Sequence, residues 1–388
     1  MPAANKSRRI LSIDILRGIV MVIMALDHAR DFFSGYRFSP TDMDHANTPM
    51  FFTRWITHFC APVFIFLSGT SAFLSAQNKS KYDTAKFLVT RGIWLIILEV
   101  TIVHFAWAFN WDFSNMFLQV IWAIGWSMIF LAAMVFLPLP AILGISLLII
   151  LGHNALDGIR AESFGQYKWS WHILHEVGPF QLTDGYGVFV MYPIVPWIAV
   201  MAAGYCFGSL LLQPEGPRNQ KLTIIGISAI LLFIILRAIN VYGDPLPWSY
   251  QDNWHHTLLS FLNCNKYPPS LLYLLMTLGS AILLLPQLEK MKNGIGRFFT
   301  VFGKVPMFYY IMHLLVLHGM ALLTALALGF PARYFTESTS SLDDKPHWGY
   351  SLPAVYMWWM LGIAILYLPC LWYMRVKSRN KKWWLSYL

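Results

Sequence analysis

The residues best suited to chemistry lie on one apolar segment near the start of the chain, from Ser12 to Phe33. The segment is long enough to cross a bilayer, yet it carries six ionisable side chains, those of Asp14, Arg17, Asp27, His28, Arg30 and Asp31. Because ionisable groups are costly within a membrane, those that occur there usually line a site or a pathway. On a helix, Arg17 and His28 would lie about 16 Å apart along the axis and within about 20° of each other. We therefore interpret this face, with Met21 and Met24 between its charged ends, as the wall of a polar path across much of the membrane.

The N-terminal end of this segment is suited to binding an anion. Asp14 and Arg17 lie three residues apart. An arginine presents a planar fork of donors that matches a phosphate, and a nearby carboxylate can orient it. Arg91, at the start of a later apolar segment, could bind the same anion. A structural ion pair at the membrane boundary explains Asp14 and Arg17 equally well, so both interpretations stay open.

The other end of the segment is suited to proton transfer. Histidine can take and return a proton near neutral pH, which makes His28 a candidate acid or base. Asp31, three residues on, is better placed to pair with it than Asp27, because adjacent side chains on a helix point about 100° apart. His45 in the following loop and His58 in the next apolar segment could converge on His28. Their spacing matches no compact metal-binding motif, so we predict no metal site. A solvated helix end is the alternative.

A membrane-embedded helical bundle must position these residues. The chain has 388 residues, of which 57% are hydrophobic and 12% charged, and its mean hydropathy is +0.52, whereas soluble domains are nearer a quarter charged. The apolar runs predict an all-α polytopic integral membrane protein, a single domain over residues 1–388 with about ten transmembrane helices. The predicted helices cover residues 10–33, 58–76, 87–109, 116–136, 141–152, 190–212, 222–242, 269–286, 305–329 and 351–374.

The distribution of basic residues predicts the orientation. With the N-terminus in the cytoplasm, the cytoplasmic segments hold 17 of the 28 lysines and arginines and the longer outward loops hold eight. This bias follows the positive-inside rule and places both termini in the cytoplasm. The net charge of +9 therefore needs no nucleic-acid partner. The four cysteines form no close-spaced pair, which excludes a disulfide framework or a zinc motif built on them.

The outward loops are rich in aromatic and polar side chains. The loop at 153–189 contains Trp169, Trp171, His172, His175 and Glu176, and a later loop has a similar composition. Aromatic rings beside hydroxyl-binding groups suit a sugar. An interfacial aromatic belt is the alternative for most of these residues.

Four stretches together indicate a family. They are Arg9–Gly18, Leu26–Phe33, Pro62–Gly69 and Tyr267–Leu274. With them the chain resembles the DUF1624 family of bacterial membrane proteins, which is related to the catalytic domain of heparan-alpha-glucosaminide N-acetyltransferase among the transmembrane acyltransferases. The resemblance implies transfer of an acetyl group from cytoplasmic acetyl-CoA to a sugar amine or hydroxyl on the far side of the membrane.

The resemblance also implies roles for particular residues. The likeness to the lysosomal relatives places their catalytic loop histidine at His45 of this chain. Those relatives have an asparagine where this chain has His28. The His28 side chain could donate to the thioester carbonyl, as an asparagine would, or act as the base itself. This chain lacks the large lumenal segment of the lysosomal enzyme, so heparan sulfate is not assumed as the acceptor.

These observations combine into one expected function and its rivals. We expect an acyl-CoA-dependent O- or N-acyltransferase of the bacterial cytoplasmic (inner) membrane. His45, His28, Asp27 and Asp31 would form its catalytic set, and Arg17, Asp14 and Arg91 would bind acetyl-CoA. Its expected partners are a CoA thioester, an extracytoplasmic saccharide and the lipid bilayer, and the sequence is compatible with a homodimer. A transporter or flippase for a polar or lipid-linked solute explains the polar interior equally well, and a structural or regulatory subunit is a third alternative.

Overall fold

The computed structural model of the chain describes residues 10–42, 45, 47–337, 345, 347–380, 382 and 385. The longer helices are α1 (Leu11–Phe33), α3 (Cys60–Ala76), α4 (Lys81–Leu98), α6 (Val120–Met134), α7 (Leu139–Gly152), α9 (Ile194–Leu210), α10 (Glu215–Ile239), α12 (Leu271–Glu289), α14 (Pro306–Ala327) and α16 (Leu352–Arg379). Shorter helices join or extend them: α2 (Thr48–Thr57), α5 (His104–Ala108), α8 (Lys168–Leu174), α11 (Trp254–Leu262), α13 (Gly294–Lys304) and α15 (Arg333–Thr336).

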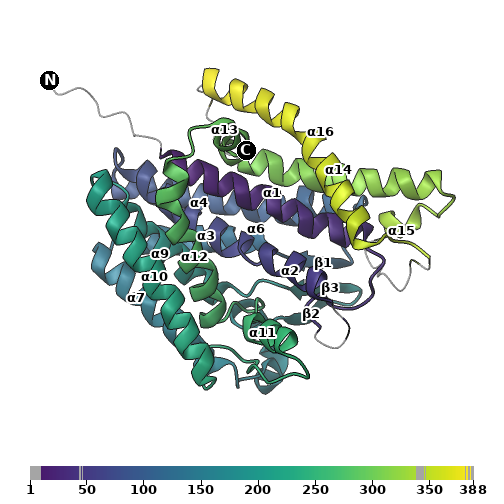
Figure 1. Ribbon diagram of the computed structural model, residues 1–388, viewed down its shortest axis with the longest axis horizontal. Helices are drawn as coiled ribbons and strands as arrows, with labels where there is room; N and C mark the ends of the chain where they lie inside the picture. The colour runs from purple at the N-terminus through teal and green to yellow at the C-terminus, as the bar shows by residue number, and fades with distance from the viewer. Residues whose placement is uncertain are drawn as a thin grey trace.

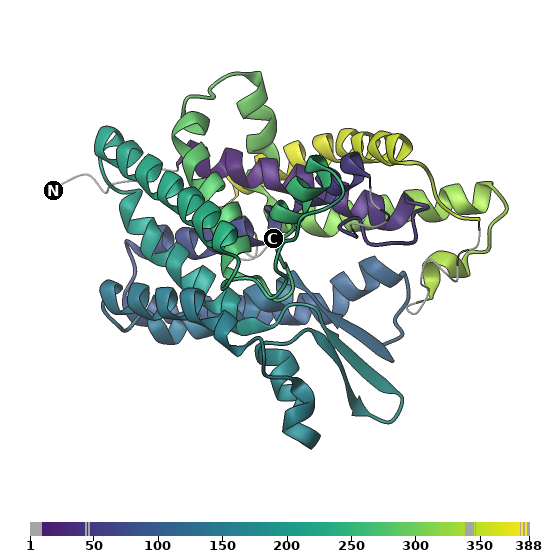
Figure 2. The same ribbon diagram turned by 60° about the horizontal axis from the view of Figure 1, so that its bottom comes forward.

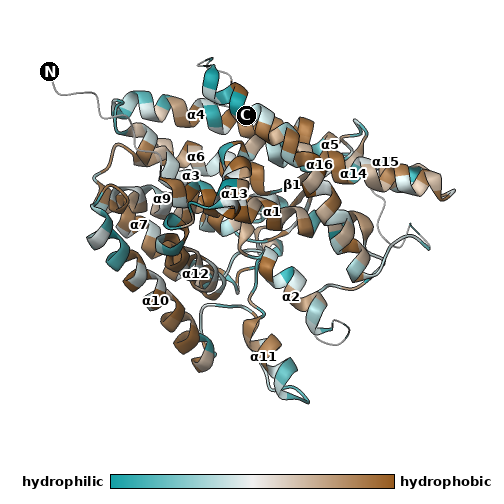
Figure 3. Cartoon of the chain, turned by 45° about the horizontal axis from the view of Figure 1, so that its top comes forward, coloured by the Kyte–Doolittle hydropathy of each residue, from teal (hydrophilic) through white to brown (hydrophobic). Residues whose placement is uncertain are grey.

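The ten predicted segments all correspond to helices, but their status as membrane spans differs. Among the described residues, seven helical stretches are long and apolar enough to cross a membrane: Thr48–Ala76, Lys81–Ala108, Leu139–Leu156, Glu215–Ile239, Leu271–Glu289, Pro306–Ala327 and Leu352–Arg379. The helices α6 and α9 are apolar but have only 15 and 17 residues, and α1 carries five Asp or Arg residues. Figure 3 shows that α10 is mostly hydrophobic after its hydrophilic first turns. A multi-pass membrane protein is therefore supported, while ten crossings and cytoplasmic termini stay predictions.

Helix α1 lies at the centre of one half of the bundle. It contacts α2, α3, α12, α13, α14 and α16, and Figure 1 shows it running beside α14 and beneath α16. Its closest approach is to α13, where Gly18 and Gly303 face the neighbouring backbone. A Cβ on Gly18 would lie 1.9 Å from the carbonyl oxygen of Phe299, and one on Gly303 would lie 1.8 Å from that of Asp14. Small residues let helix backbones approach closely in a membrane, and here they bring α13 against the start of α1.

The prediction of a wholly α-helical chain was wrong in one region. A three-stranded sheet has the order β1-β3-β2, from β1 (Asn115–Leu118), β2 (Gly178–Thr183) and β3 (Tyr186–Val190). Strand β1 pairs in parallel with β3, and β2 pairs with it antiparallel through a tight hairpin. Figure 2 shows this hairpin extending away from the helices. The predicted helix at 116–136 therefore begins only at Val120, because its first residues pair with β3 about 70 positions later in the chain.

Candidate active site

One chamber runs along α1 and joins the two ends of its polar face. Its volume is about 520 Å³, and its walls come from α1, α2, α3, α4, α6, α14, the sheet and the loop before α12. This volume is typical of a small-molecule site. Both Arg17 and His28 line it, and their side chains are only 14% and 13% exposed. The helical arithmetic that placed them on one face is therefore confirmed, and that face borders a cavity.

Arginines define the end of the chamber near the start of α1. Arg17 donates to Ser71 Oγ at 2.7 Å and to the Gly303 carbonyl oxygen at 3.2 Å. Asp14 lies 3.5 Å from the Arg17 guanidinium and is itself buried behind it. Arg91, from just past the middle of α4, lines the same chamber. The close α1–α13 contact at Gly303 thus holds Arg17 in place, and Asp14 supports it from outside the chamber.

The middle of the chamber is apolar on α1 and polar on α4. Met24 lines the chamber, whereas Met21 is fully buried in the packed core, so the predicted thioether stripe is only half present. Across from it, α4 passes into a π-helical turn, η1 (Glu99–Val103), a local widening that is often found at functional sites. The Glu99 carboxylate accepts from the backbone N–H groups of Gln119 and Trp122 at 3.2 and 3.1 Å. It therefore caps the positive N-terminus of α6.

A cluster of charges surrounds Asp27 toward the other end of α1. The Asp27 carboxylate accepts a hydrogen bond from Arg54 of α2. It also lies 2.9 Å from the Arg30 guanidinium and 3.9 Å from the Lys266 ammonium. All four residues line the chamber. With three cations around it, Asp27 is engaged in charge pairing.

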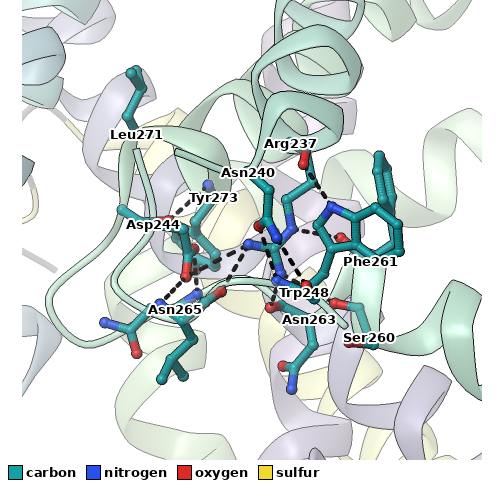
Figure 4. A network of polar contacts seen from close by, with 12 residues as sticks. Arg237, Asn240, Asp244, Trp248, Ser260, Phe261, Asn263, Asn265, Leu271 and Tyr273 are labelled. Carbon is teal, nitrogen blue, oxygen red and sulfur yellow. Dashed lines mark hydrogen bonds and ion pairs between the residues drawn. The ribbon is translucent and has the colours of Figure 1, made fainter. Parts of the chain in front are cut away.

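The loop before α12 brings Lys266 to this cluster, and a buried arginine shapes that loop. Figure 4 shows Arg237 of α10 at the centre of the network. Its guanidinium donates to the carbonyl oxygens of Leu246, Ser260, Phe261 and Asn263 at 2.8 to 3.1 Å. Asp244 lies 3.8 Å from it and accepts from the Asn265 backbone and the Ser270 hydroxyl. Every arm of the guanidinium is used, which fixes the backbone on both sides of Lys266.

Tyr267, next to Lys266, also lines the chamber and packs edge-on against Tyr192, with ring centroids 5.2 Å apart. Burial opposes ionisation of its phenol, but the positive charges of Lys266 and Arg54 outweigh that cost. The pKa of Tyr267 is therefore lowered from its ordinary value. A phenol in this setting is a better proton donor than an ordinary tyrosine.

His28 has both a carboxylate and a second imidazole beside it. Its Nδ1 lies 3.5 Å from an Asp31 carboxylate oxygen, so Asp31 is the nearby acid, as the spacing predicted. The His28 ring meets Trp107 edge-on at 4.9 Å and lies 5.1 Å from the ring of His313, between centroids. His313 is fully buried, and its Nδ1 donates to the Tyr309 carbonyl oxygen at 3.0 Å. Its Nε2 therefore carries a lone pair, which faces no hydrogen-bond donor among the described residues.

The other two predicted histidines lie elsewhere. His45 has a side chain 65% exposed, and its Nδ1 lies 2.8 Å from Asp42. His58 is buried beside Tyr273. Neither is among the described residues that line the chamber, so the three histidines do not converge there. The catalytic role of His45 stays a prediction.

Several residues of the site were not singled out from the sequence. Arg54 and Lys266 were counted only as outward basic residues, and their convergence on Asp27 depends on tertiary contacts. One signal was present, since Lys266 directly precedes the Tyr267–Leu274 stretch that supported the family resemblance.

The comparison with known families gives one match. Residues 9–241, 233 of the 388, match the family model described as heparan-alpha-glucosaminide N-acetyltransferase, catalytic. No curated protein matches the sequence. The matched range includes α1, Arg54, Arg91 and Glu99, and it ends before the loop that carries Lys266.

Proposed function

Because the chain belongs to the heparan-alpha-glucosaminide N-acetyltransferase catalytic family, we propose that it uses cytoplasmic acetyl-CoA to acetylate an extracytoplasmic saccharide. The acceptor group would be the amine of an amino sugar or a glycan hydroxyl. The proposed location is the bacterial cytoplasmic membrane. The observation that carries the proposal is the single chamber that Arg17 and His28 both line, near opposite ends of α1.

The donor would enter at the arginine end. Arg17 and Arg91 would bind the phosphates of CoA, because guanidinium groups form strong, charge-assisted hydrogen bonds to phosphate oxygens. Arg17 is held in place by Ser71, Gly303 and Asp14, so little side-chain freedom would be lost on binding. The pantetheine arm would pass Met24 and bring the thioester to the level of His28, about 16 Å along the helix.

The transfer itself would occur beside His28. The acceptor nitrogen or oxygen attacks the thioester carbonyl carbon while His28 takes its proton. The C–N or C–O bond forms, the C–S bond breaks, and the proton then passes to the CoA thiolate. Asp31 would stabilise the imidazolium ion of His28, and the Lys266 ammonium would stabilise the oxyanion. His28 takes the part of the base because it lines the chamber, whereas His45 lies on the exposed loop.

The test is release of free CoA from acetyl-CoA by purified protein in nanodiscs, with amino sugars and glycans offered as acceptors. CoA binding would be measured separately by calorimetry. Arg17→Met and Arg91→Met should each weaken CoA binding by about 10- to 150-fold, since hydrogen bonds to charged groups contribute about 1.5–3 kcal/mol. Lys304→Met is the matched control. It removes a basic residue from the end of α13 that is not among the described residues lining the chamber, and it should leave the affinity unchanged.

Equal CoA affinity in all three variants would contradict the proposal. A transporter would give a different pattern: solute uptake into proteoliposomes driven by an ion gradient, with no thioester consumed.

A further inference from the structure

A second cluster of chemically active side chains lies outside the chamber. His153 begins the short helix η2 (His153–Leu156) directly after α7, Asp157 follows that helix, and His175 follows α8. One ligand atom from each of the three residues lies within 4.8 Å of the other two. None of the three lines the chamber, and the proposed function does not use them.

The two imidazoles of this cluster are buried without hydrogen bonds. His153 and His175 are each 3% exposed, and neither nitrogen of either ring has a hydrogen-bond partner in the described part of the chain. The closest polar approach joins His175 Nε2 to an Asp157 carboxylate oxygen at 3.2 Å, without hydrogen-bond geometry. A buried polar group that lacks a partner is costly, so native proteins rarely leave one unsatisfied. Four such nitrogens beside one carboxylate therefore require an explanation.

The geometry points to a divalent transition-metal site, and we propose that His153, Asp157 and His175 bind Zn²⁺. Zinc is commonly held by histidine nitrogens and carboxylate oxygens at about 2.0–2.2 Å. Two ligands of a tetrahedral zinc ion at that bond length are about 3.3 Å apart, which agrees with the 3.2 Å between His175 and Asp157. All three ligand atoms lie within 4.8 Å of one another, so an ion between them would draw His153 closer. Three protein ligands leave the fourth position to water, and Asp157, 19% exposed, lies on the open side.

The surroundings supply the second layer of contacts that such sites usually have. The second Asp157 oxygen accepts from Asn154 Nδ2 at 2.8 Å, which orients the carboxylate. The Asn154 side-chain oxygen, Oδ1, in turn accepts from the Leu271 backbone N–H at 2.8 Å, at the first turn of α12. A bound ion would therefore fasten the end of α7 to the segment after α8 and, through Asn154, to α12. The ion would thus hold the end of α7 against the segment that joins α8 to β2.

The test is zinc content, measured by mass spectrometry on protein purified without a polyhistidine tag or chelators. About one zinc per chain is expected. His153→Gln and Asp157→Asn should each weaken zinc binding by at least about 100-fold, because even contacts behind the ligands change metal affinity by 10- to 100-fold. His255→Ala is the control: it removes an exposed histidine that is stacked on Trp254 in α11, and this variant should keep the metal.

A second measurement avoids dependence on the folding of the variants. Co²⁺ added to metal-free wild-type protein should give the intense visible absorption of a tetrahedral site, and Zn²⁺ should abolish it. Only the pale spectrum of hydrated Co²⁺, or wild-type zinc content no higher than in Asp157→Asn, would overturn the proposal. CoA release is not part of this test, so its outcome is independent of the proposed enzyme activity.

Discussion

Replacing His28 by glutamine isolates the proposed proton transfer from the rest of the chamber. Glutamine keeps a hydrogen-bonding side chain of similar reach but cannot take a proton. His28 is 13% exposed, lies 3.5 Å from Asp31 and lines the chamber. Loss of a general base costs about 100- to 10,000-fold in rate, which corresponds to about 2.7–5.4 kcal/mol of activation free energy. CoA affinity should stay within about twofold, because the phosphates would bind about 16 Å away along α1.

The assay is single-turnover release of the CoA thiol by the variant and wild type in nanodiscs, after thermal unfolding has shown that both are folded. His45→Gln is the matched comparison and should retain activity within about threefold, since that side chain is 65% exposed and outside the chamber lining. The opposite pattern, with His28→Gln active and His45→Gln inactive, would refute the assignment. It would move the proton transfer to the loop that carries His45 and leave His28 as a positioning residue.

Other perturbations test how the fold positions the chamber. Gly303→Ala should lower the free energy of unfolding by about 1–3 kcal/mol, because its Cβ would lie 1.8 Å from a carbonyl oxygen of α1. The control Gly294→Ala, whose Cβ meets nothing within 4 Å, should be neutral in the same thermal unfolding assay. Arg237→Gln should destabilise the protein by about 3–5 kcal/mol, since it leaves the buried Asp244 without its cation. Burial raises the pKa of Asp244, so its ionised form is the destabilised one. The loss of unfolding free energy in Arg237→Gln should therefore grow as the pH rises through the pKa of Asp244. Adding Asp244→Asn should recover part of that loss. Lys266→Met should lower turnover by about 100- to 1000-fold with CoA affinity unchanged, and a loss below tenfold in the CoA-release assay would contradict its role at the oxyanion.

The sequence was most informative where the argument was local. Helical periodicity alone placed Arg17 and His28 on one face and chose Asp31 over Asp27 as the neighbour of His28, and both predictions agree with the structure. These relations depend only on the rise and rotation of one helix. The helical segments were also predictable, because each is a long apolar run.

Contacts between distant parts of the chain were not predictable in this way. Lys266 reaches Asp27 only because Arg237 and Asp244 shape a loop more than 200 residues later. His45 lies in a loop without periodicity, so its distance from His28 had no signal in the pattern. Strand β1 forms only because β3 pairs with it, and its few residues read as the start of the following apolar helix.

The most direct test of the central claim is a structure of the protein determined with CoA bound. The account predicts that the phosphates lie within hydrogen-bonding distance of Arg17 or Arg91, with the pantetheine arm beside Met24 and the sulfur at the level of His28. Density for CoA at any other surface, with the chamber along α1 left without it, would contradict the account.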